Sequence, residues 1–381
     1  MDETPPQTLF EHLQTLNDPR RADSTLHPLP SILFMALCAV ICGAETWVGM
    51  EQWARAREDW LRSVIELPHG IPSHDTFARV FALLEPGSFA VMFVRWVEGV
   101  MERSEGEVVA IDGKTLRRSL ARAAGKGAVH MVSAWATDNQ LVLGQLRTDP
   151  ESNEITAVPA LLRLLKLTGC LVTVDAMNSQ RAIAEQIIDQ GADYVLPIKD
   201  NHPTLREQLV SAFESPMATD FDGVPHSYAE TRESGHGRRE TRQLWCMSKP
   251  DAVDPHEDWV GLCAVAMVRR TRTIGEQSSI EEHYFISSLL GQQADTAHKL
   301  LSAVRAHWGI ENGLHWRLDV QFDEDHSSTH AGNAAENLAR IRHMAINLLK
   351  KDASIKVGIK TKRLRAGWDH NYLLKILGVT P

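Results

Sequence analysis

The sequence predicts a mixed α/β core that is preceded by an all-α domain and interrupted by a β-rich insertion. Up to about residue 104, apolar residues recur at the spacing of amphipathic helices. From residue 107, short apolar runs alternate with helical segments, which indicates a mixed sheet covered by helices. Residues 225–290 show the alternation of strands. The predicted divisions are a helical N-terminal domain at 1–104, the first part of the core at 105–224, the insertion at 225–290, the second part of the core at 291–350 and a basic C-terminal tail at 351–381.

The N-terminal domain is predicted to be helical throughout. An apolar helix spans residues 28–43, between a Pro and a Gly, and an amphipathic helix spans 47–65. Ser73 is a predicted N-cap, and Pro86 opens a further helix that reaches about Arg103. Two helices around a tight break are compatible with a helix-turn-helix or with an all-α packing domain, and the acidic charge balance favours the second.

The core is predicted to run strand, hairpin, helix, strand, helix, strand. The predicted strands are 107–112, 130–137, 140–147, 170–175 and 193–199, and the predicted helices between them are 154–166 and 179–190. Asp138 and Asn139 form the expected two-residue link of the hairpin. A helix is predicted at 203–217, strands around 241–247, 261–269 and 283–288 form the insertion, and long helices cover 295–318 and 333–350.

Composition and charge limit the function classes. The chain has 381 residues, 43% hydrophobic and 23% charged, as in ordinary soluble proteins. Its five cysteines are odd in number and scattered, which favours a reducing cytoplasm without disulfides. Cys38 and Cys42 lie four apart, where metal ligands could meet, but buried core positions are favoured. No apolar run reaches the length of a membrane span, so we expect a cytoplasmic protein without a membrane partner.

The net charge of −9 is not evenly spread along the chain. The run from Lys350 to Arg365 holds seven basic residues and one acid. A basic segment can bind phosphates on an acidic protein because the interaction is local. DNA contact and a solvated helix surface are equally compatible with this charge pattern.

Two acids stand at the ends of predicted strands, Asp112 and Asp175. The carboxyl ends of strands are where α/β sheets form sites, although a single Asp at such a place is usually a turn residue. Two carboxylates brought together repel each other, and a divalent cation removes this cost. Mg²⁺ prefers such oxygen ligands.

A third acid, Glu311, lies in the predicted long helix at 295–318. Trp308 and Ile310 flank it, so we expect Glu311 beside a buried face, where an ionised carboxylate needs a partner. A metal ion is one such partner. An ion pair with Arg305 or Arg317 is the alternative, and for Glu311 taken alone it is favoured.

The motifs around these acids resemble a known family. Asp112 in AIDGKT, Asp175 in VTVDAMNSQ and Glu311 in HWGIEN resemble the acidic triad of DDE-type transposases. Further segments, such as YVLPIKDN at 194–201 and HGRRETR at 236–242, are similar to the H-repeat-associated branch of bacterial insertion-sequence transposases. The resemblance extends from about Leu9 to Lys350. It implies a ribonuclease-H-like catalytic core in which the triad binds two Mg²⁺ ions, for which Mn²⁺ can substitute.

The resemblance also implies a substrate and partners. The expected activity is cleavage of double-stranded DNA at the element ends and strand transfer into target DNA, by a homodimer when bound to DNA. The alternatives are a ribonuclease-H-like nuclease that only hydrolyses and a domesticated relative that binds DNA without cutting it. The candidate DNA-binding residues are Lys199, His236, Arg238, Arg305, His307, Lys350, Lys351, Lys362 and Arg363. Plain surface or loop positions are the alternatives for Lys199, His236 and Arg238.

This chain departs from the pattern of sister branches near Glu311. Many relatives there carry Tyr and Arg before the glutamate and Lys after it, where this chain has Val304, His307 and Leu318. Two lesser motifs remain. Residues 113–115 (GKT) resemble the end of a phosphate-binding loop, but the upstream glycines are missing. The acids Asp319, Asp323, Glu324 and Asp325 are expected mainly as exposed charge at a helix end.

Overall fold

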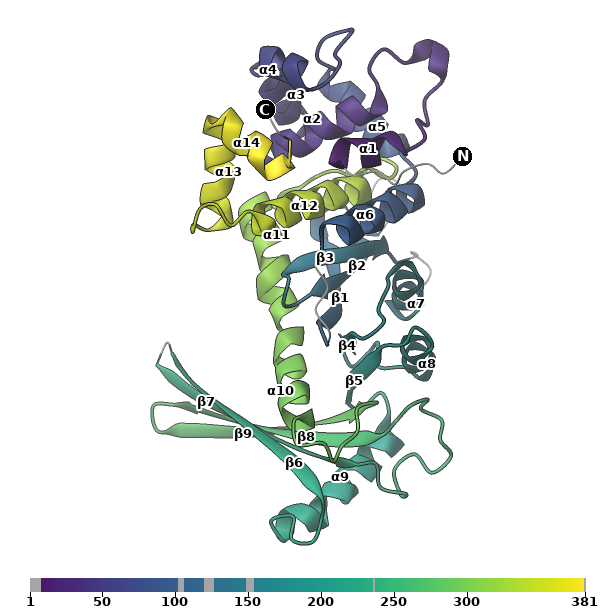
Figure 1. The fold of residues 1–381 in the computed structure, drawn as a ribbon, viewed down its shortest axis with the longest axis vertical. Helices are drawn as coiled ribbons and strands as arrows, with labels where there is room; N and C mark the ends of the chain where they lie inside the picture. Colours follow the sequence, from purple (N-terminus) through teal and green to yellow (C-terminus); the bar gives the residue numbers. More distant parts are fainter. Residues whose placement is uncertain (1–7, 102–105, 120–126, 149–153, 236, 380–381) are drawn as a thin grey trace.

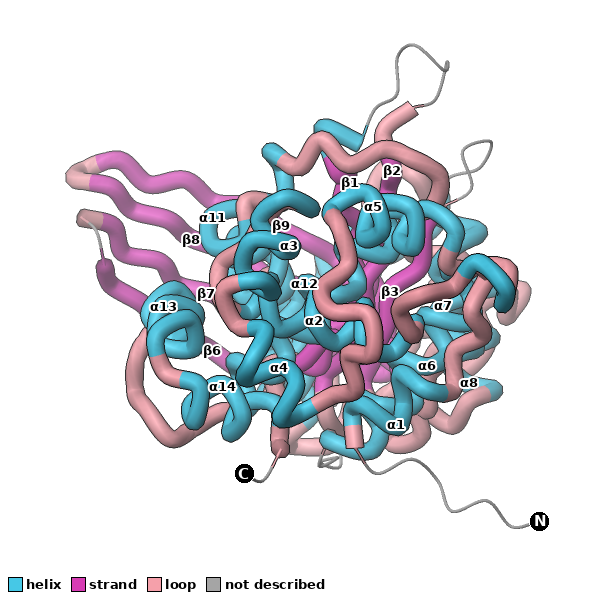
Figure 2. Tube along the Cα trace, turned by 90° about the horizontal axis from the view of Figure 1, so that it is seen from above, coloured by secondary structure: helices cyan, strands magenta, loops and turns pink. Residues whose placement is uncertain are grey.

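A computed structural model of the chain describes residues 8–101, 106–119, 127–148, 154–235 and 237–379 (Figure 1). The N-terminal helices lie at one end of the elongated molecule, a group of long strands lies at the other, and helix α10 runs between them. In both views the long hairpins at the strand-rich end extend beyond the body of the molecule (Figures 1 and 2).

One mixed sheet of nine strands forms the centre of the fold. The strands are β1 (Val108–Leu116), β2 (Val129–Ala136), β3 (Leu141–Arg147), β4 (Leu171–Val174), β5 (Asp193–Ile198), β6 (His226–Gly235), β7 (Arg238–Ser248), β8 (Ala264–Ile274) and β9 (Gln277–Ser287), in the order β3-β2-β1-β4-β5-β9-β8-β7-β6. β1, β2 and β3 are antiparallel neighbours, whereas β4 and β5 run parallel to β1. The β-rich segment is not a separate sheet, because β9 pairs directly with β5.

The register of β1 corrects one expectation about Asp112. The strand does not end at Asp112 but continues to Leu116, paired with β2. The parallel pairing with β4 does stop there, at the pair Ile111 and Val174. Asp112 and Asp175 directly follow this last pair along the two chains. The strand register therefore places the two acids next to each other.

The hairpin between β2 and β3 is longer than predicted. Residues 137–140 form a four-residue turn in which Gln140 adopts a left-handed φ of 53°. The carboxylate of Glu107, which is buried, accepts hydrogen bonds from the backbone N–H and the side-chain amide of Asn139. These bonds hold the wider turn closed beside the start of β1.

Six helices fold from residues 8–101. They are α1 (Leu9–Gln14), α2 (Leu29–Ile41), α3 (Trp47–Arg55), α4 (Glu58–Val64), α5 (His74–Leu83) and α6 (Pro86–Val100). Ser73 caps α5 as predicted, since its hydroxyl accepts from the backbone N–H of Thr76. The helix predicted at 47–65 is instead broken at Arg57, whose guanidinium bonds the carbonyl of Gly367 and the ring of His370.

The remaining helices cover the sheet and join it to the N-terminal helices. They are α7 (Glu154–Leu164), α8 (Arg181–Asp189), α9 (Pro203–Ala218), α10 (Thr296–His307), α11 (Trp316–Phe322), α12 (Ala334–Lys351), α13 (Ile359–Trp368) and α14 (His370–Leu377). α12 is buried along nearly its whole length between β3 and the helices α2, α5 and α6. One continuous hydrophobic core therefore runs from the N-terminal helices into the sheet.

Residues 351–379, which belong to the predicted basic tail, fold into helices that pack on the rest of the protein. α13 and α14 pack on α12, and α13 also contacts α2. The side chains of Ile359, Ala366, Leu373 and Leu377 are buried there. Burial of apolar side chains therefore determines how this segment folds, although basic residues are its most conspicuous feature in the sequence.

Within the described part of the chain, no single helix is both long and apolar enough to cross a membrane. Only α5 and α6 taken together meet the length and composition criteria, and a bend of 92° separates them.

Candidate active site

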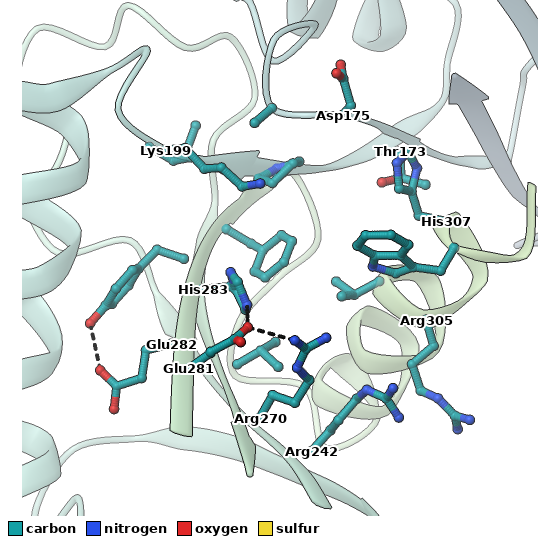
Figure 3. Close-up of a pocket in the computed structure, with 18 of the residues that line it drawn as sticks. Thr173, Asp175, Lys199, Arg242, Arg270, Glu281, Glu282, His283, Arg305 and His307 are labelled. Atoms are coloured by element: carbon teal, nitrogen blue, oxygen red, sulfur yellow. Dashed lines mark hydrogen bonds and ion pairs between the residues drawn. The ribbon is translucent and has the colours of Figure 1, made fainter. Parts of the chain in front are cut away.

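The three predicted acids line one pocket. A cavity of about 920 Å³ is bounded by the middle of β1, by the ends of β4 and β5, by the long strands β7 to β9 and by α10. Asp112, Asp175 and Glu311 all contribute to its lining, and Figure 3 shows Asp175 among other residues of the pocket. Glu311 thus lies on the same side of the sheet as the two aspartates.

Asp112 is half-buried in β1 and contacts a histidine. Nε2 of His315, which is buried, lies 3.2 Å from Oδ2 of Asp112. Burial alone would raise the pKa of the Asp112 carboxyl, but the contact with His315 and the nearby His307 hold it below its ordinary value. Asp112 is therefore held in its ionised form.

Asp175 begins the turn between β4 and α8. Its Oδ1 accepts a hydrogen bond of 2.9 Å from the backbone N–H of Asn178. Burial raises the pKa of Asp175, and the negative charges of Glu154 and Asp112 raise it further, against the effect of that hydrogen bond. The raised pKa therefore reflects burial first and the neighbouring negative charges second.

Glu311 occupies an unusual helical segment. The helix predicted at 295–318 is interrupted after α10, and residues 311–315 form a π-helical turn before α11. Such turns are rare and frequently occur at functional sites. The expected buried surroundings are only partly present: Ile310 is buried, but Trp308 is 65% exposed and Glu311 itself is exposed. The alternative ion pair with Arg305 is not formed, because Arg305 pairs with Glu233.

The donor chemistry of the pocket suits a divalent cation. Among the residues that the structure describes, no three or more Asp, Glu, His or Cys side chains are gathered closely enough to hold a metal as placed. The three carboxylates nevertheless share one pocket, and Asp112 raises the pKa of Asp175. A hard divalent cation would relieve this repulsion, so the residues fit such an ion.

A fourth acid near the site, Glu154, was not predicted. It is the first residue of α7, and its carboxylate accepts a hydrogen bond of 2.7 Å from Nδ2 of Asn178 and lies 2.5 Å from Nε2 of His130. The only feature of the sequence that could have indicated a group at this position is Gly113, directly after Asp112. A Cβ at Gly113 would lie 2.3 Å from Oε1 of Glu154, so any other residue would collide with this carboxylate.

Comparisons with known proteins match nearly the whole chain. Residues 103–348 match the family model "Transposase DDE domain", and residues 10–97 match "DDE_Tnp_1-associated". The chain belongs to the DDE transposase family. It is 39% identical to "H repeat-associated putative transposase YhhI" of Escherichia coli (strain K12), over 97% of each chain. It is also 39% identical to "Putative transposase YncI" of E. coli O157:H7, over 97% of this chain and 94% of that one.

A solved structure of a piggyBac transposase synaptic complex with hairpin DNA is also similar to this transposase. It has a TM-score of 0.43 and 10% sequence identity, over 97% of this chain and 77% of that chain.

Several predicted DNA-binding residues of the transposase surround the triad. Lys199, Arg238, Arg305 and His307 line the pocket, whereas His236 lies outside the described residues. His307 is largely buried, and this burial lowers the pKa of its imidazole despite the nearby Asp112 and Asp175.

The two lysines at the end of α12 that were predicted to bind DNA contact groups of the protein itself. The ammonium group of Lys350 lies 4.6 Å from the centre of the Trp135 ring and donates to Oε1 of Gln140. Burial lowers the pKa of Lys350 to about 7. Lys351 is exposed, and its ammonium donates to the carbonyl of Val100. Lys350 is therefore half-buried against Trp135, whereas Lys351 lies at the surface, and DNA binding by both stays a prediction.

Lys362 and Arg363 are buried and bind the protein itself. Lys362 donates to the carbonyl of Leu349 at the end of α12, a favourable place for a cation. Arg363 donates to the carbonyl of Val40 and to Glu45. These two cations hold α13 in place and direct their charges at groups of the protein itself, and DNA binding by them stays a prediction.

Further arginines that were not predicted lie with Arg238 on the pocket side of β7 and β8. We call Arg238, Arg242, Arg270 and Arg272 the arginine face. Arg242 pairs in register with Arg270, and side chains alternate along a strand, so the four project to the same side. Figure 3 shows Arg242 and Arg270 close to Arg305 of α10.

Glutamates hold part of the arginine face. Glu240, which is buried, lies 2.5 Å from Arg242 and 4.0 Å from Arg270. In the described ranges, no carboxylate pairs with Arg238 or Arg272, and Nε of Arg272 is buried without a hydrogen-bond partner. No carboxylate of the described residues therefore neutralises these two cations of the arginine face.

Proposed function

We propose that the chain is a DNA transposase that cleaves DNA at the ends of a bacterial insertion sequence and joins the freed ends to target DNA. The observation that carries the proposal is the meeting of Asp112, Asp175 and Glu311 in one pocket beside the arginine face. Acids that can hold metal ions and cations that can hold phosphates then lie next to each other, as phosphodiester chemistry requires.

In this proposal Asp112 and Asp175 hold the metal ions, and Glu311 completes the set of ligands. When bound, two Mg²⁺ or Mn²⁺ ions supply activation of the attacking oxygen and stabilisation of the leaving oxygen in an in-line displacement. His315 holds the Asp112 carboxylate from the side of the π-helical turn. Lys199, Arg305 and the arginine face position the DNA backbone, and the active form on DNA is a homodimer.

The proposal is tested with a duplex that carries the inverted repeats flanking the gene of this chain. We expect nicked, excised and strand-joined products with Mg²⁺ or Mn²⁺, and binding without cleavage with Ca²⁺. Ca²⁺ accepts longer and looser oxygen coordination, so the in-line geometry is lost while binding survives. Gel analysis of labelled ends distinguishes the products. Cleavage without any joined product would favour a nuclease that only hydrolyses, and binding without cleavage in every metal would favour a domesticated relative.

A second prediction concerns the arginine face. Changing Arg238 and Arg272 together to Gln should weaken DNA binding and reduce the slope of log affinity against log salt by about 1 for each phosphate that is no longer neutralised. Both side chains line the pocket without a carboxylate partner in the described structure, so their charge is open to phosphate. Binding is measured by fluorescence anisotropy at several salt concentrations.

Neighbouring residues of the same strands provide a matched control. Arg239 and Arg269 follow or precede members of the arginine face, so they project to the opposite side of the sheet. The double change of Arg239 and Arg269 to Gln removes the same formal charge and should leave the salt slope nearly unchanged. Equal effects of the two double variants would show that only overall charge matters, and the arginine face would lose its role.

A further inference from the structure

We propose that Glu154 is a positioning residue that clamps the turn carrying Asp175 to the strand carrying Asp112. The inference rests on the proposed function, because it assigns Glu154 a task in the same pocket. The residue is 9% exposed and stands at the start of α7, the helix that follows β3. A carboxylate removed from water at such a place needs donors for its oxygens.

One oxygen of Glu154 holds the Asp175 side. Oε2 accepts 2.7 Å from Nδ2 of Asn178, a residue that is 0% exposed. The backbone N–H of the same Asn178 donates to Oδ1 of Asp175. One buried residue, Asn178, therefore connects the two carboxylates: its side-chain amide donates to Glu154, and its backbone N–H donates to Asp175.

The other oxygen of Glu154 holds the Asp112 side. Oε1 lies 2.5 Å from Nε2 of His130 on β2, and Nδ1 of His130 lies 2.8 Å from the hydroxyl of Thr115 on β1. Gly113 gives the room that this arrangement needs, since its missing Cβ would lie within 2.5 Å of both partners. The glycine after Asp112 is thus explained by the clamp and not by a turn.

Both oxygens of Glu154 face protein donors, which distinguishes its role from that of a metal ligand. The clamp fixes Asp112, which lies within β1, relative to Asp175, which stands in the turn after β4. Displacements of about 1 Å can cost on the order of 10²-fold in rate, so such a connection has a direct effect on catalysis. Residues behind metal ligands typically contribute about 10- to 100-fold to metal affinity or activity.

The test compares Glu154→Ala and Glu154→Gln with a control, Glu185→Ala, on the exposed surface of α8. We expect Glu154→Ala to speed hydrogen exchange of the side-chain amide of Asn178, which loses its acceptor. We also expect it to weaken Mn²⁺ binding, measured by calorimetry, about 10- to 100-fold. Glu154→Gln keeps the size and can accept from Asn178 while it donates to His130. It should stay within about tenfold of the wild type in Mn²⁺ affinity and cleavage, because it keeps most of the support that the carboxylate gives.

Two results would overturn the proposal. If Glu154→Ala leaves the exchange of Asn178 and the Mn²⁺ affinity unchanged, the clamp does not exist. If Glu154→Gln is as inactive as Asp112→Asn and binds Mn²⁺ as poorly, Glu154 is itself a metal ligand. Hydrogen exchange needs neither DNA nor metal, so a wild type that neither binds Mn²⁺ nor cleaves would refute the proposed function, whereas the exchange data would still decide on the clamp.

Discussion

Changing Asp112 to Asn, Asp175 to Asn or Glu311 to Gln is expected to lower the rate of DNA cleavage by about 10³-fold or more. Loss of one member of a catalytic unit typically has an effect of at least this size. Each substitution keeps the shape of the side chain and removes one negative charge that can hold a metal ion. DNA binding should persist and can even tighten, because a negative charge near phosphate is removed. Cleavage rates and anisotropy on the same duplex check both parts.

An acid of the same pocket provides the control for this prediction. Asp200 lines the pocket and is almost fully exposed, with Arg206 3.7 Å away. Changing Asp200 to Asn removes the same charge and should leave cleavage within a few fold, as expected for a solvent-screened group. A double change of Asp112 and Glu311 should be no worse than either single one. Cleavage at the wild-type rate by Glu311→Gln would remove Glu311 from the set of ligands.

The sequence predicted the triad because its three acids stand in recognisable motifs, and the structure brings them to one pocket. It could not predict the register that makes Asp112 and Asp175 neighbours, since pairing between distant strands is set by the whole sheet. Nor could it predict the π-helical turn at Glu311. The apolar spacing around it fits an ordinary helix, and a π turn shifts that spacing by only one residue.

Charge was the least reliable guide. Lys362 and Arg363 lie in the most basic run of the chain, yet their charged groups bind carbonyls inside the fold. A count of charges does not show which charged groups will bind backbone carbonyls, because those contacts depend on how α13 packs. Conversely, Arg270 and Arg272 belong to an acidic region, and strand alternation alone brings them to the pocket.

The GKT motif after Asp112 leads to the largest expected effect on stability. Its lysine, Lys114, contacts Asp319 and lies 2.7 Å from Oε2 of Glu324, which is only 2% exposed. Glu324 was expected as exposed helix-end charge and is instead a buried ion-pair partner. Burial would raise the pKa of the Glu324 carboxyl, but Lys114 and Arg342 hold it below its ordinary value.

Changing Lys114 to Met is expected to lower the free energy of unfolding at pH 7 by about 3–5 kcal/mol, because it leaves a buried carboxylate without its nearest cation. Urea denaturation measures the change. The control is Arg117→Ala. The Arg117 side chain is 79% exposed and lies 3.3 Å from Asp325. Because the Arg117 side chain is largely in solvent, its pair with Asp325 should contribute no more than about 1 kcal/mol.

A second variant and a pH series separate this ion pair from loss of packing. Adding Glu324→Gln to Lys114→Met removes the uncompensated charge and should recover part of the lost stability.

Because the pKa of Glu324 is lowered in the folded state, its contribution to stability is present above the ordinary carboxyl pKa and is lost as pH falls through the lowered value. The wild type should therefore lose stability on acidification more steeply than the double variant. Equal pH dependence of the two proteins, or no recovery in the double variant, would show that Lys114 acts through packing alone. Since Lys114 shares β1 with Asp112, and Glu324 follows the helix that begins after the π turn of Glu311, the same pair ties two of the three acids to one rigid frame.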